Sequence, residues 1–566
     1  MATTIESRGT GSRGRLHLGW IRGGWIAFGA VVAILALYLL SVLGLVLAVT
    51  RPVADEATLR AMVDQAVTDR LAQAGGGEVP EGYYTLSEIA QHNDTATSCW
   101  VIVDDLVFDL TEFAKMHPAQ YRNCGGDSST VYHNQHGPVI RDQMMIHNIG
   151  QVWRGNEPAP SATPAQGATV VPEGCPAESI GGPINPVTTT YVDPGSWDVD
   201  ELMLVVEKDC RSIIFIDGRV HEVVGRIDDL GHQMHAPTPS PDGRFVYVIA
   251  RDGWLSKIDL ATLEVVNSID VGVNSRGTGV TDDGRYLLVG NFEPNTAVLL
   301  DADTLDVVKT FEATGSVNGG PVIPSKVGGV VELGTKIYMV LKDVNAVWEI
   351  ETADPDFPVR KYENLGDGQT PLHDAYVTPD GKYLLAAVQG ANKVWVLDTS
   401  TGEEVAEVPT GVTPHTGPGA TVGNLTFIPT LDPEGVVSVI DTTTWTNVKN
   451  IDTGGPSLFI RHNPTAETVD AYPYVWAETA LGDRQDEIYV IDVRSLEIIQ
   501  TLKPVPGESS WHPEFTYDGQ EVYVVSQTGN AIVVYDANTF DVIKTIEAKT
   551  PSAVFNMGIR AHEPGL

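Results

Sequence analysis

The sequence predicts a multidomain protein with one N-terminal transmembrane helix, a small α+β domain and an all-β eight-bladed propeller. Three observations predict this fold class. An uncharged apolar run covers 25–50, a histidine-rich segment with short strand patterns covers 83–150, and one strand pattern repeats from about residue 200 onward. At 566 residues, the chain is long enough for several domains.

The composition excludes several classes of function. The chain has 74 Asp and Glu residues against 36 Lys and Arg residues, so a basic surface for nucleic acid is not expected. The four cysteines form no Cys-x-x-Cys pair, which excludes a redox dithiol, a zinc-finger spacing and covalent haem attachment. An exported chain permits disulfides, and the simplest of the three connectivities pairs Cys99 with Cys124 and Cys175 with Cys210.

The N-terminal segment is predicted to be a membrane anchor. Residues 1–24 are polar and contain arginines, while the apolar run at 25–50 exceeds the about 20 residues that a spanning helix needs. The arginines precede the run and Asp55 and Glu56 follow it, so the N-terminus is expected in the cytoplasm. The protein would then cross the cytoplasmic membrane once, with its C-terminal domains in the periplasm. A cleaved signal peptide is the alternative, but the run is too long and lacks a small-residue cleavage site.

Residues 51–78 have helical spacing and are predicted to form a stalk helix. A dimerising helix, and with it a homodimer, is an alternative that the sequence does not support further. Residues 79–152 are predicted to form the small α+β domain. Thr85 and Glu88 make a plausible capping box, and the stretch 98–111 is typical of two short strands around a turn.

A second set of histidines lies in the α+β domain. A short helix at 112–116 is expected to lead to His117-Pro, and Cys124-Gly-Gly-Asp runs on to Gln-His136-Gly. With the Ser-Cys-Trp start and Phe-Asp-Leu-Thr, these pieces resemble the cytochrome b5 family, in its bacterial exported form, over about seventy residues. The resemblance implies haem b with His117 and His136 as axial ligands, although His133 competes with His136. Two imidazole ligands leave the iron no open position, which favours electron transfer; a similar fold without haem is the alternative.

The rest of the chain is a linker and a repeat. The segment 153–195 is rich in Pro, Ala, Thr and Gly and is predicted to be a linker. In 196–566 one unit recurs, with an alternating strand, a loop, and a second strand that ends in an acidic residue before a polar turn. Eight copies spaced by 42 to 51 residues predict an eight-bladed β-propeller. The acidic residues are Asp217, Asp259, Asp301, Glu351, Asp398, Asp441, Asp492 and Asp536.

One phrase recurs at the same place in several repeats. His235 and His373 each stand eight residues before the glycine of a Pro-Asp-Gly turn. Arg276 has this offset in a third copy, and Trp511 has it in a fourth, where His512 follows. Residues shortly before such turns face the centre of a propeller. The sequence therefore predicts imidazoles and a guanidinium around one mouth.

Five segments of the repeat region share a further pattern. They are His235 with the following Arg-Phe-Val-Tyr-Val, Leu372-His-Asp, Thr413-Pro-His-Thr-Gly-Pro-Gly, Ser457-Leu-Phe-Ile and Thr550-Pro-Ser-Ala-Val-Phe-Asn. Together they resemble the d1-haem domain of cytochrome cd1 nitrite reductases and their relatives in d1-haem maturation, over essentially all of 200–566.

This resemblance implies a d1-type haem, or a d1 precursor, in the propeller. His235 would be the proximal iron ligand, His373 a distal proton donor, and Arg276 would face the carboxylates of the macrocycle. Arg461 is also assigned to cofactor binding. The tail at 560–566 and the Asn-Phe-Glu-Pro at 291–294 are closer to the maturation branch.

Two departures from the reductases concern the distal side. The reductases carry a second distal histidine, and Glu332 is the nearest residue to its expected place. Pro418 stands where the family has an arginine. His415 or His512 is therefore the candidate for a second proton donor.

The first hypothesis is a membrane-anchored haem oxidoreductase that reduces nitrite to nitric oxide. Electrons from a quinol enzyme or an electron-donor protein would enter haem b and pass to haem d1. Arg276 would attract the anion, and His373, with His415 or His512, would supply protons.

The alternative is a maturation protein that binds a d1 precursor and oxidises or modifies it, with haem b as the electron acceptor. A second alternative is a haem-free propeller that binds a partner protein, because a fold alone does not determine function.

Overall fold

The structure is a computed structural model. It describes residues 82–94, 98–103, 106–111, 124–128, 147–153, 175, 183–417, 419–432, 435–466, 468–479 and 481–563. The spans predicted at 25–50, 51–78 and 112–116 lie outside these residues. In the part of the chain that is described, no helix is both long and apolar enough to span a membrane.

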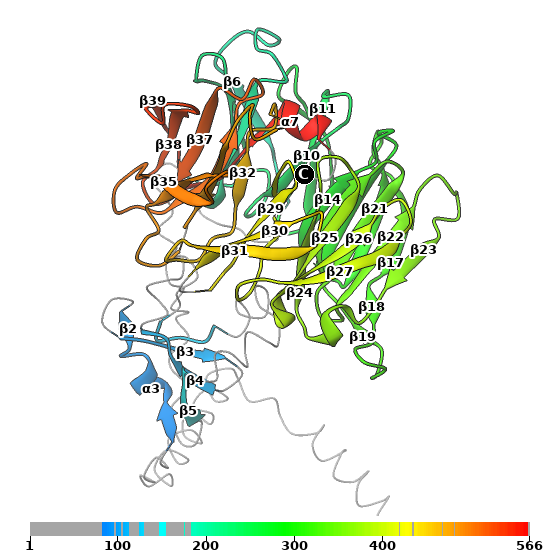
Figure 1. The fold of residues 1–566 in the computed structure, drawn as a ribbon, viewed down its shortest axis with the longest axis vertical. Helices are drawn as coiled ribbons and strands as arrows, with labels where there is room; N and C mark the ends of the chain where they lie inside the picture. The colour runs from blue at the N-terminus through cyan, green and yellow to red at the C-terminus, as the bar shows by residue number, and fades with distance from the viewer. Residues whose placement is uncertain are drawn as a thin grey trace, which may run out of the picture. The chain divides into compact units, whose positions relative to one another are not determined.

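The small domain contains a mixed five-stranded sheet with the strand order β1-β5-β4-β3-β2 (Figure 1). Its elements are β1 (Tyr83–Thr85), α3 (Leu86–Ile89), β2 (Asn93–Asp94), β3 (Ser98–Val103), β4 (Leu106–Asp109) and β5 (Asn148–Trp153). Strand β1 pairs in parallel with β5, and the other pairs are antiparallel. Thr85 caps α3, since its hydroxyl accepts the N–H of Glu88 at 3.1 Å, as the capping box predicts.

Both predicted disulfides are formed. Cys99 is bonded to Cys124, so the bridge holds β3 to the segment at 124–128 in the small domain. Cys175 is bonded to Cys210, which lies between strands β7 and β8. The pairing of sequence neighbours is therefore confirmed.

The propeller is confirmed by seven four-stranded antiparallel sheets and one five-stranded sheet, which make eight blades among the described residues. Blade 1 contains β10 (His235–Pro239), β11 (Phe245–Ile249), β12 (Trp254–Asp259) and β13 (Glu264–Asp270). Blade 2 contains β14 (Asn274–Val280), β15 (Tyr286–Glu293), β16 (Thr296–Asp301) and β17 (Val307–Glu312), and is followed by the pair β18 (Thr314–Gly315) and β19 (Ile323–Pro324). Blade 3 contains β20 (Val327–Leu333), β21 (Lys336–Leu341), β22 (Ala346–Glu351) and β23 (Val359–Tyr362). Blade 4 contains β24 (Leu372–Val377), β25 (Tyr383–Val388), β26 (Lys393–Asp398) and β27 (Glu403–Pro409).

The remaining blades follow the same plan. Blade 5 contains β28 (Ala420–Val422), β29 (Leu425–Pro429), β30 (Val436–Asp441) and β31 (Thr446–Asp452). Blade 6 contains β32 (Ile460–His462), β33 (Tyr474–Glu478), β34 (Ile488–Asp492) and β35 (Glu497–Leu502). Blade 7 contains β36 (Ser510–Phe515), β37 (Glu521–Ser526), β38 (Ala531–Asp536) and β39 (Val542–Glu547). Blade 8 contains β40 (Pro551–Asn556), β7 (Leu202–Glu207), β8 (Ser212–Asp217), β9 (Glu222–Asp228) and β6 (Val187–Thr190). Short 3₁₀ segments are η3 (Lys208–Cys210), η4 (Leu365–Gly368) and η5 (Gln389–Ala391).

Blade 8 closes the ring with strands from both ends of the propeller. Strand β40, near the C-terminus, pairs antiparallel with β7, near the start of the repeat. The helix α7 (Met557–His562) follows β40 and contacts β40, β7 and β10 (Figure 1). The first strands β10, β14, β20 and β24 contact one another in turn, as do β28, β32, β36 and β40. The first strand of every blade therefore lies innermost.

The linker predicted at 153–195 is shorter than expected. Strand β6 at Val187–Thr190 falls inside that range, and it pairs antiparallel with β9 at the outer edge of blade 8. The segment Val-Thr-Thr-Thr consists of β-branched residues, which suit a strand. Composition alone had concealed this strand, because prolines and glycines surround it.

The acidic residues that mark the repeat are turn caps. Each ends the third strand of its blade, and its carboxylate accepts the backbone N–H two residues later at 2.8 to 3.0 Å. A side chain that accepts a nearby N–H stabilises a tight turn. The repeat marker is therefore a structural feature of the outer part of each blade.

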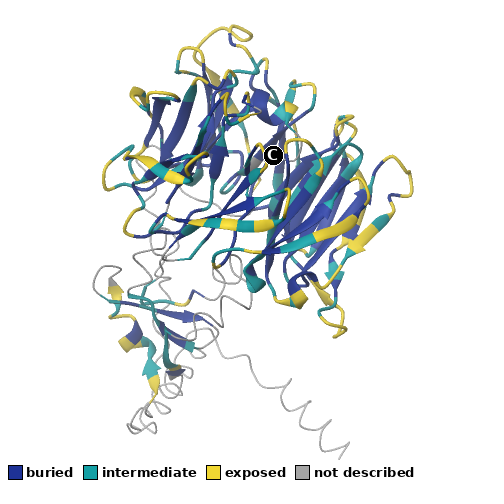
Figure 2. Ribbon diagram, in the orientation of Figure 1, coloured by how far each residue is buried: buried dark blue, intermediate teal, exposed yellow. Residues whose placement is uncertain are grey.

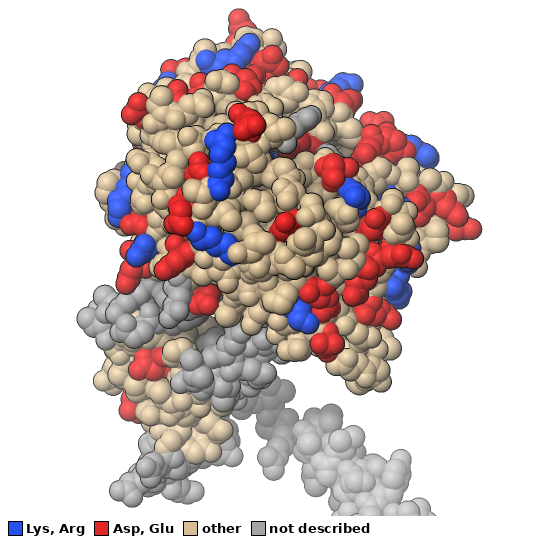
Figure 3. All heavy atoms as spheres, viewed as in Figure 1, with Lys and Arg blue, Asp and Glu red and all other residues tan. Residues whose placement is uncertain are grey.

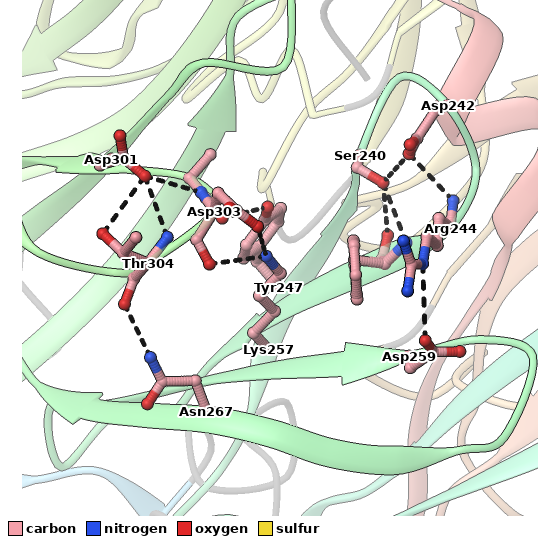
Figure 4. A network of polar contacts seen from close by, with 12 residues as sticks. Ser240, Asp242, Arg244, Tyr247, Lys257, Asp259, Asn267, Asp301, Asp303 and Thr304 are labelled. Carbon is pink, nitrogen blue, oxygen red and sulfur yellow. Dashed lines mark hydrogen bonds and ion pairs between the residues drawn. The ribbon is translucent and has the colours of Figure 1, made fainter.

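The Pro-Asp-Gly turns also have one common geometry. In blade 1, Ser240 Oγ donates to Asp242 Oδ1 at 2.5 Å, and the same oxygen accepts the N–H of Arg244 at 3.1 Å (Figure 4). Gly243 has a φ of 69°, a conformation that favours glycine. The same hydroxyl-to-aspartate bond occurs at Thr281, Thr378 and Thr516. These turns join the first strand to the second, as the repeat predicts.

Burial is highest in the inner and middle strands and falls toward the outer strands (Figure 2). In β25 five of six residues are buried, whereas β31 alternates between exposed and half-buried residues with one buried position. Neighbouring blades pack their apolar faces together, and polar contacts tie their edges. Lys257 Nζ of blade 1 contacts Asp303 Oδ1 at 3.2 Å, and Asn267 Nδ2 donates to the carbonyl of Thr304 at 2.7 Å (Figure 4). This packing holds the first strands at fixed positions around the centre.

Candidate functional site

The pairing of the innermost strand is interrupted in five blades, and in four of them the interruption lies at or directly after a predicted site residue. The pairing of β14 skips Arg276, and that of β24 skips His373 and Asp374. In β36 the interruption covers His512, and in β10 it begins directly after His235. The fifth lies in β20 between Val327 and Val330. A β-bulge leaves residues unpaired and changes the direction of their side chains. Bulges therefore present these imidazoles and the guanidinium at the innermost strands.

His235 has the properties of a ligand for a metalloporphyrin. Its Nδ1 is buried and completes no hydrogen bond, although the backbone of Arg276 lies close to the ring. Removal from water, and then the charges of Arg276 and Arg251, lower the pKa of His235 well below its ordinary value. The ring is therefore neutral, which is the form that binds iron. A neutral imidazole with an unsatisfied buried nitrogen fits the predicted role.

Two further histidines share one carboxylate. His373 Nδ1 lies 3.5 Å from Asp374 Oδ1, and His415 Nδ1 lies 3.3 Å from Asp374 Oδ2. The two rings are 4.9 Å apart between centroids. Burial lowers the pKa of both histidines, most strongly that of His373, and the carboxylate opposes this shift. Of the two candidates for a second proton donor, His415 and His512, it is His415 that lies beside His373 and shares its carboxylate.

Glu332 does not complete this pair. Its charged neighbours are Asp282 and Arg560, not His373, and burial raises its pKa to about 8. His415, which the sequence predicts as a candidate second proton donor, precedes strand β28 instead of lying on it.

A row of rings runs from His415 across the next blades. His415 contacts Phe459 at 5.7 Å between centroids, Phe459 contacts His512 at 3.4 Å, and His512 contacts Phe555 at 5.2 Å. His512 has a φ of 50°, and burial, followed by Arg560, lowers its pKa well below the ordinary value. Successive rings are tilted by 69°, 41° and 74°, so the row is an uneven aromatic surface on the side of blades 5 to 8.

Glu478 holds the middle of this aromatic row. Its carboxylate is fully buried and accepts the N–H groups of His512 at 2.6 Å, Phe459 at 3.1 Å and Leu458 at 3.3 Å. Burial raises the pKa of Glu478 to about 8, although the three N–H donors oppose this shift. Glu478 thus fixes the backbone that carries Phe459 and His512.

Four cationic residues surround Phe292 on blades 1 to 3. Arg251, Arg276, Lys326 and Lys342 lie 5.4 to 6.0 Å from the ring centroid, and we call them the Phe292 cluster. Burial, then the charge of Arg276, lowers the pKa of Lys342 to about 7. In a chain with a net charge of −38, with acidic residues spread over the surface (Figure 3), four neighbouring cations indicate an anion site. Carboxylates of a tetrapyrrole fit such a cluster.

Arg461 lies in a different environment from that expected of a cofactor-binding residue. Its Nη2 donates to Glu514 Oε1 at 2.6 Å, and both side chains are almost completely buried. The guanidinium is therefore half of a buried ion pair, although its Nε has no hydrogen-bond partner. Arg461 acts electrostatically on His512 and so remains close to the centre.

Sequence reasoning found the histidines but missed their supports. Asp374 directly follows a predicted site residue, yet its bonds to the next blade cannot be seen in the sequence. Lys342 follows an apolar strand and gives only the weak signal of a charge at a strand end. Glu478 lies at the end of an apolar strand and carries no motif at all.

The axial ligands predicted for haem b, His117 and His136, lie outside the described residues, as do His133 and Pro418. The sheet that would carry them is described only in part. For the b-type site, the sequence pattern therefore remains the basis of the assignment.

Two family models match this chain. The cytochrome D1 heme domain matches residues 197–560, and the cytochrome b5-like heme/steroid binding domain matches residues 85–149. The first match covers more than half of the chain, so the protein belongs to the cytochrome D1 heme domain family. Both resemblances drawn from the sequence are confirmed, and with them the two haem classes.

Individual relatives refine this assignment. The chain is 35% identical over 363 residues to dihydro-heme d1 dehydrogenase of Pseudomonas aeruginosa, covering 63% of this chain and 71% of the relative. It is 31% identical over 381 residues to protein NirF of Stutzerimonas stutzeri, covering 65% and 93%. Nitrite reductase of Stutzerimonas stutzeri is 25% identical over 405 residues, covering 64% and 71%.

A solved structure supports the same assignment. The structure titled dihydro-heme d1 dehydrogenase NirN in complex with DHE matches with a TM-score of 0.58 and 32% identity. It covers 66% of this chain and 80% of that chain.

Proposed function

We propose that this protein is an oxidoreductase that dehydrogenates a d1-type tetrapyrrole precursor and passes the electrons to a b-type haem. The observation that carries the proposal is that His235 and His373, both on innermost strands, each face cations of the Phe292 cluster, and that His415 adjoins His373. The ranking of relatives supports it, because the dehydrogenase is more similar to this chain than the nitrite reductase. Maturation is thus favoured over nitrite reduction.

The residues of the propeller divide the work of holding the substrate. The neutral ring of His235 would bind the iron of the tetrapyrrole, and the Phe292 cluster would bind its carboxylates. The aromatic row from His415 to Phe555 would pack against the flat macrocycle. The bound tetrapyrrole supplies the carbon–hydrogen bonds that are broken and the conjugated system that carries the charge.

The reaction must release protons and electrons in equal number. Conversion of one carbon–carbon single bond to a double bond releases two protons and two electrons. His373 and His415 are suited to accept a proton, because burial keeps them neutral and Asp374 favours the protonated form. The electrons would leave one at a time through haem b to an oxidised electron-transfer protein.

The membrane anchor at 25–50 belongs to the same proposal. Its position before the b5-like domain would place both haem sites on the outer side of the membrane, near carriers of electrons. A protease-protection assay on membrane vesicles would test this topology.

The test of the function uses the purified full chain loaded with haem b under anaerobic conditions. Addition of the dihydro form of the d1 tetrapyrrole should reduce two haem b groups for each precursor oxidised, with conversion of its absorption spectrum. Extraction with acid acetone should then recover a non-covalent d1-type pigment. Failure of the precursor to bind would leave the haem-free propeller that docks a partner protein.

Nitrite reduction is retained as a second candidate because His373 and His415 stand side by side. Reduction of nitrite to nitric oxide consumes one electron and two protons and yields water, and paired histidines suit that demand. Reduced protein loaded with finished haem d1 and mixed with nitrite should release no nitric oxide if the dehydrogenase assignment is right. Rapid release of nitric oxide would reverse the order of the two candidates.

A further inference from the structure

We infer that Asp374 is a positioning residue that fixes the orientation of His373 and His415 and limits the pair to one shared extra proton. This inference rests on the proposed function for its role in catalysis, but its geometry stands by itself. Within the described residues, the partners of Asp374 are His373, His415, Thr416 and Gly417, and they include neither His235 nor a residue of the Phe292 cluster. It acts through the two imidazoles.

The carboxylate of Asp374 joins two blades. It lies in the bulge of β24 in blade 4, and it binds the segment that precedes β28 in blade 5. Oδ1 accepts the N–H of Thr416 at 3.1 Å and its hydroxyl at 2.9 Å, while Oδ2 accepts the N–H of Gly417 at 2.7 Å. The segment that carries His415 is thus fastened to the strand that carries His373.

Gly417 is part of this attachment. Its φ is 45°, and a Cβ at this position would lie 3.1 Å from His415 Nδ1 and 3.3 Å from the carbonyl of Leu458. Any other residue would press on the imidazole ring. The close approach of the glycine N–H to Asp374 therefore requires a residue without a side chain.

The carboxylate has room for one more full hydrogen bond. An ionised carboxylate has about four acceptor positions, and three are taken by Thr416 and Gly417. The remaining position is on Oδ2, which lies nearer to His415 at 3.3 Å. His415 would therefore present Nδ1–H to the carboxylate and leave Nε2 as the free base. His373 competes for the same group from 3.5 Å.

Electrostatics limits the pair to a single added proton. Two imidazolium rings 4.9 Å apart would repel each other strongly in a buried site, and one carboxylate balances only one of them. Lys342 faces both histidines and Arg276 faces His415, and each adds positive charge. His512 also lies near His415, but burial lowers its pKa well below the ordinary value, so its ring is neutral and adds no charge. The first proton therefore has to leave before a second can be accepted.

Within the described ranges, His373, Asp374 and His415 also form a group whose potential metal-ligating atoms all lie within 4.8 Å of one another. The three hydrogen bonds that the carboxylate already accepts account for its position. The arrangement is explained by hydrogen bonding and charge.

The test compares Asp374→Asn with Thr416→Val in the full chain. Asparagine keeps the size of the side chain but removes the charge, so the pKa of both histidines should fall. We expect the oxidation rate at neutral pH to fall about 100-fold, with the acidic limb of the pH–rate profile displaced to lower pH. The Kd for the precursor should stay within about threefold, because its carboxylates are bound elsewhere.

Thr416→Val is the matched control. It removes the hydroxyl bond to Asp374 and loosens the same segment, but it leaves the carboxylate charged. A small loss of rate with an unmoved acidic limb is expected. If both variants gave the same profile, Asp374 would be a structural tie only, and the inference would be overturned.

A measurement without substrate separates the inference from the proposed function. Solid-state ¹⁵N spectra of the chain labelled at histidine, assigned with His373→Gln and His415→Gln, report the protonation of each ring. In the ligand-free protein one ring of the pair should gain a proton on acidification, and in Asp374→Asn neither should do so over the same range. Simultaneous protonation of both rings would refute the inference. Absence of precursor oxidation in the unaltered chain would refute the proposed function alone.

Discussion

Blades 1 to 3 and blades 4 to 7 contribute different chemistry to the same centre. On the first side stand the Phe292 cluster and His235, and the local charge is positive. On the second side stand His373, His415 and His512 with buried carboxylates and an aromatic row. This difference supports the proposal that the first side binds an anionic ligand and that the second side accepts protons.

The largest effect is expected for a substitution among the histidines of blades 4 to 7. His415→Ala should lower kcat for precursor oxidation by about 100-fold or more, since general bases contribute factors of that order. The Kd for the precursor should change little, because the anion-binding side is untouched. Single-turnover absorption measurements separate the two quantities. Equal losses of binding and rate would remove the division between the two sides.

The complementary change is Lys342→Met on the anion-binding side. Loss of one charge-assisted contact costs about 1.5–3 kcal/mol, so the Kd for the precursor should rise at least tenfold. The rate at saturation should be retained. Titration of precursor fluorescence or absorption at several salt concentrations would show a weaker salt dependence than in the unaltered chain.

Lys342 also gives the binding a defined pH dependence. Burial sets the pKa of Lys342 at about 7, and an anionic partner would raise it. Binding should therefore take up protons near neutral pH and weaken as the pH rises above 7 and the amine loses its charge. Calorimetry in buffers of different ionisation enthalpy measures this uptake. In Lys342→Met the uptake should be reduced.

The buried carboxylate of Glu478 should make the free energy of unfolding depend on pH. Its folded pKa of about 8 lies above the unfolded value of 4.5, so burial of the charge is unfavourable. This contribution to stability is fully present below pH 4.5 and is lost as the pH rises through about 8. Denaturant unfolding of ligand-free Glu478→Gln should show a flatter pH dependence over that window. An unchanged slope would mean that the three N–H donors keep the carboxylate ionised.

The smallest effect is expected for a substitution in an outer turn of a blade, away from the centre. Asp301→Ala removes the cap from one outer turn of blade 2 and should cost about 1 kcal/mol of unfolding free energy. Precursor binding and oxidation should remain as they were. Urea denaturation, followed by the activity assay, checks both statements. A large loss of activity would show that the outer turns control the centre.

Much of this architecture follows from sequence periodicity. The acidic turn caps recur in every blade, because each outer turn has the same geometry, and so the number of blades could be counted. The histidines could be placed because the Pro-Asp-Gly turn fixes their distance from a strand end. The partners of those histidines could not be placed, since Asp374 binds a segment 42 residues away. The burial of Glu332 and its charged neighbours could not be predicted for the same reason, since they depend on how adjacent blades pack.

The pairing of β40 with β7 has a consequence for biogenesis. The ring stays open, with two unprotected sheet edges, until the residues up to Asn556 have been made. The same C-terminal part of the chain brings Phe555 and Arg560 next to His512, so an unfinished chain lacks part of the candidate site as well as the seam. A nascent or prematurely terminated polypeptide would therefore lack residues that the proposed tetrapyrrole site uses.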